Sequence, residues 1–226
     1  MDMEDAVIVD VEATPTRISK EVGATAIMIE RTENRFGLKP DRIAGGMAYG
    51  TGRMLGWLVK RDIDPHVPVW DKGKRDDGTF SRGDFTYDKE RDLNVCPTGK
   101  ILRATGNLHS DNTDRYIANK HDCAGCAVKK KCCSNVPVRR VPRDLNEDAR
   151  DYTRDLMETE AYYHSGINRK QIERLFGEAK NILSMVRLRL RGLSGAQDEF
   201  LLTATVQNLK RLANHSIRSP PQPVIA

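Results

Sequence analysis

The sequence lacks any long hydrophobic run, and it carries cysteine in only one short region. No run approaches the roughly 18 to 20 apolar residues that a membrane-spanning helix needs, which argues against a membrane protein. The first residues, MDMEDAVIVDVEA, are acidic and lead straight into a strand-like segment, so they do not resemble a secretory signal. We therefore expect a polar protein of the cytoplasm with no membrane partner.

The five cysteines all lie between positions 96 and 133. Their odd number and the absence of an export signal make a disulfide framework the poorer interpretation. The segment HDCAGCAVKKKCC places two cysteines on one CxxC turn, and zinc prefers four soft ligands in a tetrahedron. The candidate ligands of a structural Zn²⁺ are Cys96, Cys123, Cys126 and Cys132, with Cys133 as the alternative to Cys132 and His121 in reserve. The competing interpretations are reduced, unligated thiols and redox disulfides.

The positive charge is clustered rather than spread evenly. The net charge is +5 and the isoelectric point is near 9.0, which by itself points only weakly to nucleic acid. The first twelve residues are acidic, whereas basic residues gather in KKKCC (129–133), VRRVPR (138–143) and RLRLRG (187–192). Clusters of this kind favour a polyanionic partner.

The first 70 residues alternate between strand-like and helix-like patterns. The apolar, β-branched segment 6–14 predicts a strand, and a helix is expected from there to Phe36, where Gly37 ends it. Strands are expected again at 42–50 and 64–70, with a helix at 51–61 between them. Crossovers of this length allow parallel pairing, so the sequence predicts the α/β class.

A polar, turn-rich segment interrupts this pattern, and helices follow it. We expect residues 1–70 to form the first part of a core, residues 71–143 to form a cysteine-rich insertion without regular apolar periodicity, and residues 144–214 to complete the core. A small subdomain with few apolar residues needs a staple, which favours a bound metal. The last helix should bury Phe200, Leu201, Leu202, Val206, Leu209 and Leu212, and residues 215–226 should form a disordered tail.

One predicted helix carries a stripe of charged residues. In GINRKQIERLFGEAKN (166–181), Arg169, Glu173 and Lys180 follow at spacings of four and seven, which places them on one side of a helix. Composition alone favours a solvated face with an ordinary Arg–Glu ion pair. The alternative is one wall of a site that handles phosphate.

The stripe resembles the signature Tyr-x2-Arg-x3-Glu-x6-Lys of DDE insertion-sequence transposases, in particular of their cysteine-bearing branch. The segments DVEATPTRISKEV, AYGTGRMLGWLVKRDIDPHVPVWDK, GTFSRGDFTYD and CPTGK also look like that family, so the resemblance covers nearly the whole chain. It implies an RNase H-like core and three carboxylates that hold two Mg²⁺ ions for phosphodiester chemistry. Glu173 would be the third carboxylate, while Arg169 and Lys180 would contact the end of the transposon DNA. Three further candidates for DNA contact are Arg187, Arg189 and Arg191.

The sequence departs from the family pattern at three places. The tyrosine position of the signature falls on Gly166, and the second aspartate position, in AGGMAYG, falls on Gly46. The strand that carries the first aspartate is expected before segment 6–14, and the resemblance places Asp10 in a later strand. We therefore expect an incomplete RNase H-like core and a truncated, catalytically defective copy in which Glu173 is the surviving carboxylate.

Three functions compete at this point. The chain could be a decayed transposase, a non-catalytic zinc-containing DNA-binding protein, or a remnant with no partner. The second of these would occupy transposon ends or associate with an intact transposase, and self-association is a further option. DNA is the common partner of the first two.

Overall fold

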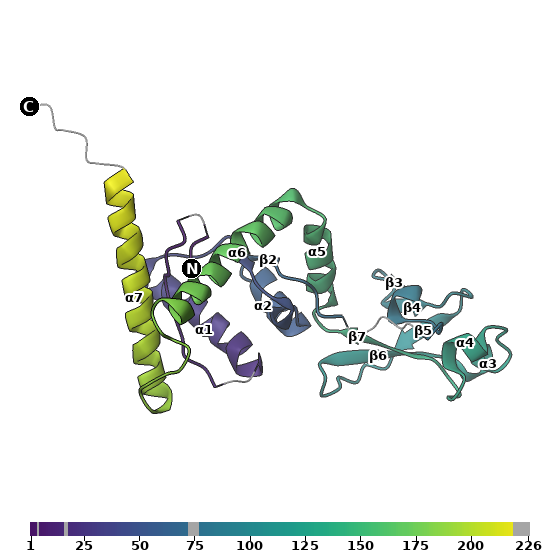
Figure 1. The fold of residues 1–226 in the computed structure, drawn as a ribbon. Helices are drawn as coiled ribbons and strands as arrows, with labels where there is room; N and C mark the ends of the chain where they lie inside the picture. Colours follow the sequence, from purple (N-terminus) through teal and green to yellow (C-terminus); the bar gives the residue numbers. More distant parts are fainter. Residues whose placement is uncertain (4, 16–17, 72–76, 219–226) are drawn as a thin grey trace, which may run out of the picture. The chain divides into compact units, whose positions relative to one another are not determined.

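The structure, a computed structural model, combines α-helices with short strands (Figure 1), which is compatible with the predicted α/β class at that coarse level. It describes residues 1–3, 5–15, 18–71 and 77–218. The chain divides into two compact units, of which the first comprises residues 1–49, 58–68 and 153–226 and the second comprises residues 50–57 and 69–152. The boundaries predicted from the sequence and the RNase H-like core stay predictions.

The first unit is mainly helical. Its elements are α1 (Ile18–Phe36), β1 (Arg42–Ala44), the short 3-10 helix η1 (Met47–Tyr49), β2 (Asp64–His66), α6 (Glu160–Asn181) and α7 (Gly192–Arg218). Helices α2 (Gly52–Val59) and α5 (Glu147–Met157) each have residues in both units. The predicted end of the first helix is confirmed, because Gly37 takes a φ of 64° and its N–H donates to the Glu33 carbonyl. None of the described helices is long and apolar enough to cross a membrane.

Strands β1 and β2 pair in parallel, as the sequence predicted. Arg42 lies opposite Asp64 and Ala44 lies opposite His66, so the ladder is three residues long. Helix α6 packs on both strands. Because so short a parallel pair is marginal by itself, its stability depends on the helix that covers it.

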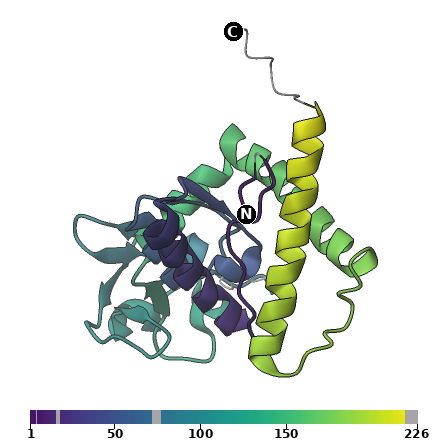
Figure 2. The ribbon, with the colours of Figure 1, turned by 90° about the vertical axis from the view of Figure 1, so that its left-hand side faces the viewer.

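The prediction of a strand at 6–14 is wrong. This segment forms no ladder with any described strand and runs beside α7 (Figure 2). Ile8 both donates its N–H to the Asn208 side-chain amide and accepts from it, each over 2.9 Å. The Gln197 amide bonds to Ala13 N–H and to the Val11 carbonyl in the same way. Side-chain amides of a helix therefore satisfy backbone groups that a neighbouring strand would otherwise bond.

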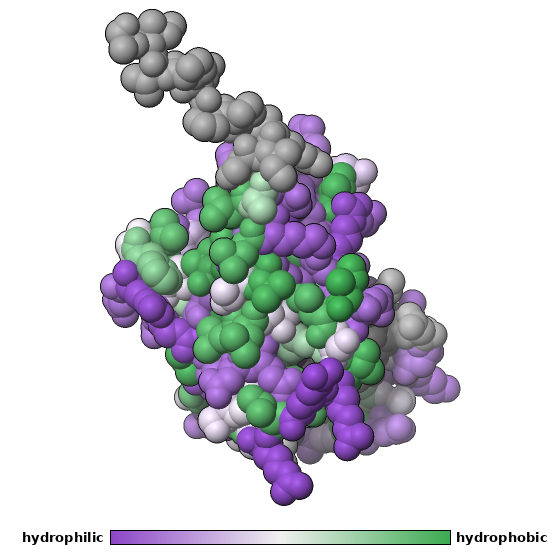
Figure 3. All heavy atoms as spheres, turned by 60° about the vertical axis from the view of Figure 1, so that its left-hand side comes forward, coloured by the Kyte–Doolittle hydropathy of each residue, from purple (hydrophilic) through white to green (hydrophobic). Residues whose placement is uncertain are grey.

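Helix α7 turns its apolar side chains outward, which corrects the buried face predicted for it. Leu202 and Leu209 are 66% and 59% exposed, and Leu201, Val206 and Leu212 are exposed as well. Figure 3 shows the apolar side chains gathered on the face that carries this helix. Ala204 and Gln207 lie on the inner side instead. The helix continues to Arg218, and residues 219–226, part of the predicted tail, lie outside the described residues.

The second unit is built on an antiparallel sheet of five strands in chain order. The strands are β3 (Thr86–Asp88), β4 (Leu93–Val95), β5 (Ile101–Ala104), β6 (Thr113–Ala118) and β7 (Arg140–Asp144), and η2 (Arg82–Asp84) precedes them. Two short helices, α3 (Lys120–Ala124) and α4 (Lys129–Cys133), lie between β6 and β7.

This sheet corrects the expectation of an insertion that lacks apolar periodicity. Its core contains Phe85, Leu102, Tyr116 and Val141 together with Cys123 and Cys133. Each strand is three to six residues long and supplies only one or two inward side chains. Such short alternations are hard to distinguish from a loop in the sequence.

Candidate functional site

The carboxyl end of β1 carries two glycines with different surroundings. The N–H of Gly45 donates to the His66 carbonyl over 3.3 Å, so Gly45 extends the parallel ladder. A Cβ on Gly45 would lie 3.0 Å from Val67 Cγ1 and 3.1 Å from Tyr49 Cδ2, so these two side chains would have to move by a few tenths of an ångström to admit a methyl group. A Cβ on Gly46 would meet only Arg169 Nη1, at 3.6 Å. Position 46 therefore has space for a larger residue, at the sheet edge where α/β proteins place ligands.

Helix α6 is fixed to β2 by a buried hydrogen bond. Thr159 caps the helix, and its hydroxyl accepts from the Tyr162 N–H. One turn later, Ser165 Oγ lies 2.7 Å from His66 Nδ1, and the two residues are 2% and 5% exposed. Burial lowers the pKa of His66, with a further contribution from the charge of Arg42, so the ring is neutral at pH 7. Nδ1 of a neutral ring can accept a hydrogen bond from the Ser165 hydroxyl.

The geometry brings Gly46, Arg169 and Glu173 together. Arg169 lies one helical turn after Ser165, and its Nη2 is 3.6 Å from Glu173 Oε1. Its Nη1 is the atom nearest to a Cβ on Gly46. Lys180 lies two turns after Glu173 on α6 and is exposed. Gly166, at the tyrosine position of the signature, is exposed as well. An arginine therefore lies between the helix carboxylate and the end of β1.

The other acidic residue considered in the sequence has its own partner. Asp10 Oδ2 lies 2.8 Å from Arg31 Nη2, and Glu12 Oε2 lies at the same distance from that nitrogen. The hydrogen bond with Glu12 raises the pKa of Arg31, and the bond with Asp10 adds to it. Both carboxylates thus neutralise one guanidinium that lies on α1.

The residues at the end of β1 do not fit a two-metal centre. Across the described parts of the chain, no three His, Cys, Asp or Glu side chains form a group that could hold a metal ion. Glu173 is 67% exposed and has an arginine as its neighbour. Two-metal phosphoryl transfer needs carboxylates that flank both ions, and Mg²⁺ retains its waters rather than bind tightly to one carboxylate.

The segment between α6 and α7 presents three arginines to solvent. Arg187, Arg189 and Arg191 are all exposed. Glu199, in the first turns of α7, holds this segment because its Oε1 accepts the N–H groups of Arg189 and Leu190 at 2.7 Å and 2.6 Å. The backbone is thus anchored while the guanidinium groups extend outward.

All five cysteines are reduced and line one small pocket in the second unit. Cys96 follows β4, Cys123 and Cys133 belong to α3 and α4, and the Cys133 thiol lies within hydrogen-bonding reach of both Cys132 and Cys123. His121, the reserve ligand, is exposed and does not line this pocket. The structure therefore gathers the predicted ligands but adds Cys133 to them.

The thiols differ in acidity. Burial raises the pKa of Cys132 to about 11, and the neighbouring thiols of Cys133 and Cys123 add to the effect. Burial alone would raise the pKa of Cys96. Hydrogen bonds from Thr98 and from the Lys100 N–H stabilise the thiolate more strongly, so the pKa of Cys96 is lowered. The donor chemistry suits zinc, whereas the side-chain arrangement of the described residues does not form a metal-binding group. Zinc binding stays a prediction.

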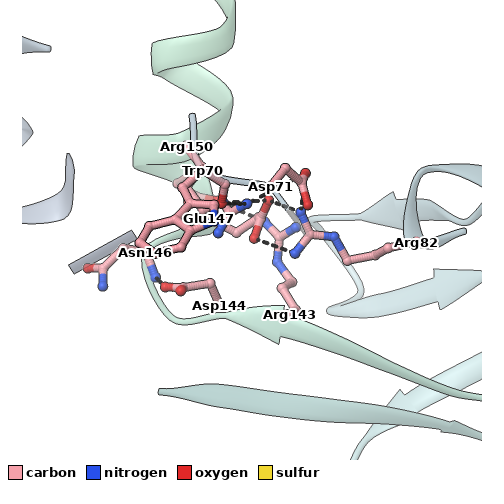
Figure 4. Close-up of polar contacts among 9 residues, drawn as sticks. Trp70, Asp71, Arg82, Arg143, Asp144, Asn146, Glu147 and Arg150 are labelled. Atoms are coloured by element: carbon pink, nitrogen blue, oxygen red, sulfur yellow. Dashed lines mark hydrogen bonds and ion pairs between the residues drawn. The ribbon is translucent and has the colours of Figure 1, made fainter. Parts of the chain in front are cut away.

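A buried charge network in the second unit was missed in the sequence (Figure 4). Glu147, at the start of α5, accepts two hydrogen bonds from Arg82, over 2.9 Å and 3.1 Å. Arg150 lies 3.4 Å from Glu147 and donates to the Trp70 carbonyl, and Asp71 faces both arginines. The network joins the residues where segment 71–147 begins to those where it ends. The only sequence signal was the Glu-x2-Arg spacing of NEDAR, which is too common to be specific.

The comparisons with known proteins give one match. Residues 95–213, more than half of the chain, match the family model described as a transposase DDE domain. No curated protein matches the chain, and no solved structure matches it either.

The two glycines at the end of β1 give a matched pair of substitutions. Gly45→Ala should lower the free energy of unfolding by about 1–3 kcal/mol, because the new methyl group would press on Val67 and Tyr49. Gly46→Ala should change it by no more than about 0.5 kcal/mol. Urea unfolding of both variants measures the difference. Equal losses would contradict the space described at position 46.

In the metal-free chain, kept so by a chelator, the cysteines should differ in their reactivity toward iodoacetamide. With a pKa of about 11, roughly one Cys132 thiol in a thousand is ionised at pH 8, and only the thiolate reacts. Cys96 should therefore react at least about tenfold faster, as peptide mass spectrometry over time would show. Equal rates would contradict the assignment. Protection of Cys96, Cys123 and Cys126 before the chelator is added would establish a bound metal.

Proposed function

This chain belongs to the DDE transposase family, and we propose that it is a DNA-binding member that does not cleave or join DNA by itself. The family acts on DNA and uses divalent metal ions. The proposal concerns how much of that chemistry these particular residues retain.

The observation that carries the proposal is the pairing of Gly46 with Arg169. The resemblance assigns the second carboxylate to position 46, where this chain has no side chain and where Arg169 Nη1 is the nearest group. Glu173 then stands as a single carboxylate beside a cation. A guanidinium next to one carboxylate is suited to holding a phosphate, since arginine binds phosphate oxygens through two parallel N–H donors. It is poorly suited to concentrating Mg²⁺.

DNA contact is assigned to the exposed cations of the first unit. Arg169 and Lys180 lie on one side of α6, and the loop arginines 187, 189 and 191 have no ion-pair partner among the described residues. A polyanion would compensate this group, and the released counterions would make binding weaker as salt rises.

The rest of the proposal concerns the architecture. We propose that the first unit is an RNase H-like core and that the thiols of the second unit hold a structural Zn²⁺. The parallel β1–β2 pair, with α6 packed on it, supports the former. The convergence of five cysteines on one pocket supports the latter. A four-thiolate zinc would have no open position for substrate.

A second candidate function is association with an intact transposase. The exposed apolar side of α7 favours it, because monomeric proteins rarely expose contiguous apolar patches of this kind. In this version the chain would occupy transposon ends or join a mixed complex.

Binding of the full chain to a fluorescent duplex tests the proposal. The wild-type chain should bind with a linear fall of log K with log salt. Arg169→Gln combined with Lys180→Gln should reduce that slope by about 2, since each neutralised phosphate contributes about one unit. The matched control is Lys170→Gln with Arg174→Gln, which removes two exposed cations from another side of the same helix.

Nicking of supercoiled plasmid in Mg²⁺ completes the test. The wild-type chain and Glu173→Gln should both leave the plasmid intact. Equal loss of slope in the control variant would contradict the assigned contacts. Mg²⁺-dependent nicking that Glu173→Gln abolishes would contradict the absence of catalysis.

A further inference from the structure

Over β5, β6 and β7, the sheet of the second unit has one buried face and one open face. At β4 both faces are covered, because Leu93, which lies opposite Arg103, is buried as well. Leu102 lies opposite Ala118, and Tyr116 lies opposite Val141. These four side chains are buried, and they pack with Cys123 of α3 and Cys133 of α4. Side chains alternate along a strand, so the residues between them point to the other face.

The open face carries three arginines on neighbouring strands. Arg103 of β5 lies opposite Ile117 of β6, and Ile117 lies opposite Arg140 of β7, so the three form one row across the sheet. Arg115 precedes Ile117 by two residues and shares its face. Neighbouring strands are about 4.8 Å apart, so Arg103 and Arg140 are separated by about 10 Å, and Arg115 lies about 7 Å along the strand from the row.

These arginines differ from Arg139 and Arg143 of the same unit in their lack of direct hydrogen bonds and ion pairs. Arg139 donates to the carbonyls of Cys132 and Phe80, and Arg143 pairs with Asp148 over 3.0 Å. By contrast, the guanidinium groups of Arg103, Arg115 and Arg140 make no hydrogen bond or ion pair with any residue that the structure describes.

The acidic neighbours of the row compensate it only in part. Asp111 is exposed, accepts a hydrogen bond from the Thr113 hydroxyl, and is close enough to Arg115 for that charge to help lower the pKa of Asp111. Asp144 lies at the end of β7, opposite Thr113, and its Oδ1 accepts the N–H of Asn146. Asp114 points to the buried face beside Arg143 and accepts from Thr105 and from the Arg115 N–H. Three guanidinium groups within about 10 Å of one another, with one exposed carboxylate beside them, leave an excess of positive charge. The cations repel one another, and a polyanion lying across the face would reduce that repulsion.

We propose that the open face of β5–β6–β7, through Arg103, Arg115 and Arg140, is a second contact surface for the DNA backbone. The rise of about 3.4 Å per phosphate is measured along the helix axis, and consecutive phosphates of one strand are farther apart than that because each step also rotates. A row of about 10 Å therefore faces about two phosphates of one strand. Ile117 and Pro142 lie between the arginines and offer apolar contact to the sugars. The inference rests on the proposed DNA binding and extends it to residues outside the signature helix.

The test compares two triple variants of the full chain. Arg103→Gln, Arg115→Gln and Arg140→Gln together should weaken binding to a random-sequence duplex about tenfold or more at 0.1 M salt and should reduce the salt slope by about 2 to 3. The control is Arg91→Gln, Lys100→Gln and Lys120→Gln, which removes three exposed cations of the same unit outside this face. Circular dichroism melting checks that both variants remain folded.

The outcomes separate this inference from the proposed function. Loss in the first variant alone supports the surface. Equal behaviour of the two variants would overturn it and leave the Arg169–Lys180 contacts to carry the binding. Competition by polyglutamate as effective as that by DNA of equal charge would also overturn it, because the face would then accept any acidic polymer. A wild-type chain that does not bind the duplex would contradict the proposed function itself.

Discussion

The hydrogen bond between His66 and Ser165 is the constraint on which the candidate site depends. It joins β2 to α6 inside the first unit, where neither side chain has access to water. Leaving either group unpaired in that position would cost roughly 1–3 kcal/mol. The bond fixes the height of α6 against the two strands, and Arg169 follows one turn later beside Gly46. The position of the signature residues is therefore set by two buried polar groups that the signature does not contain.

Polar contacts hold segment 6–14 and helix α7 in the first unit. Amide side chains of α7 bond the backbone of segment 6–14, and the Gln207 amide donates to the Leu175 carbonyl. The same helix exposes its leucines. A helix that buries amides and exposes leucines gains little from the hydrophobic effect, so a partner that covers the leucines would stabilise it further. The second unit combines an apolar core with a buried Arg–Glu network.

Local patterns predicted the elements whose partners are near in sequence. The helix ending at Phe36, the parallel pairing across α2 and the helix with Arg169 and Glu173 all follow from periodicity and from a glycine stop. The prediction of a strand at 6–14 was wrong because a strand also needs a neighbouring strand to pair with. The pattern of nine residues carries no information about such a neighbour. The predicted burial of the apolar face of α7 was wrong because amphipathicity shows where an apolar stripe lies but not whether another element covers it. The sheet at 86–144 was not predicted because its strands are too short to show a clear alternation of apolar and polar residues.

The sequence identified some residues of the candidate site but not those that hold them in place. The family resemblance marked Arg169, Glu173 and position 46, and in the structure Arg169 lies next to each of the other two, while the roles of these residues stay predictions. His66 and Ser165 could not be found in this way, because a lone histidine in a strand and a serine in a helix carry no specific pattern. The unpaired arginines of the sheet were equally invisible, since the sequence shows Arg139, Arg140 and Arg143 as one cluster although the fold gives them different roles.

The most direct measurement is the binding of Mn²⁺, a paramagnetic substitute for Mg²⁺, followed by electron paramagnetic resonance. The central claim is that a single carboxylate beside Arg169 does not form a two-metal centre. The wild-type chain and Glu173→Gln should then show the same weak binding with no saturable tight site. Two tightly bound ions in the wild-type chain that are lost in Glu173→Gln would contradict the account.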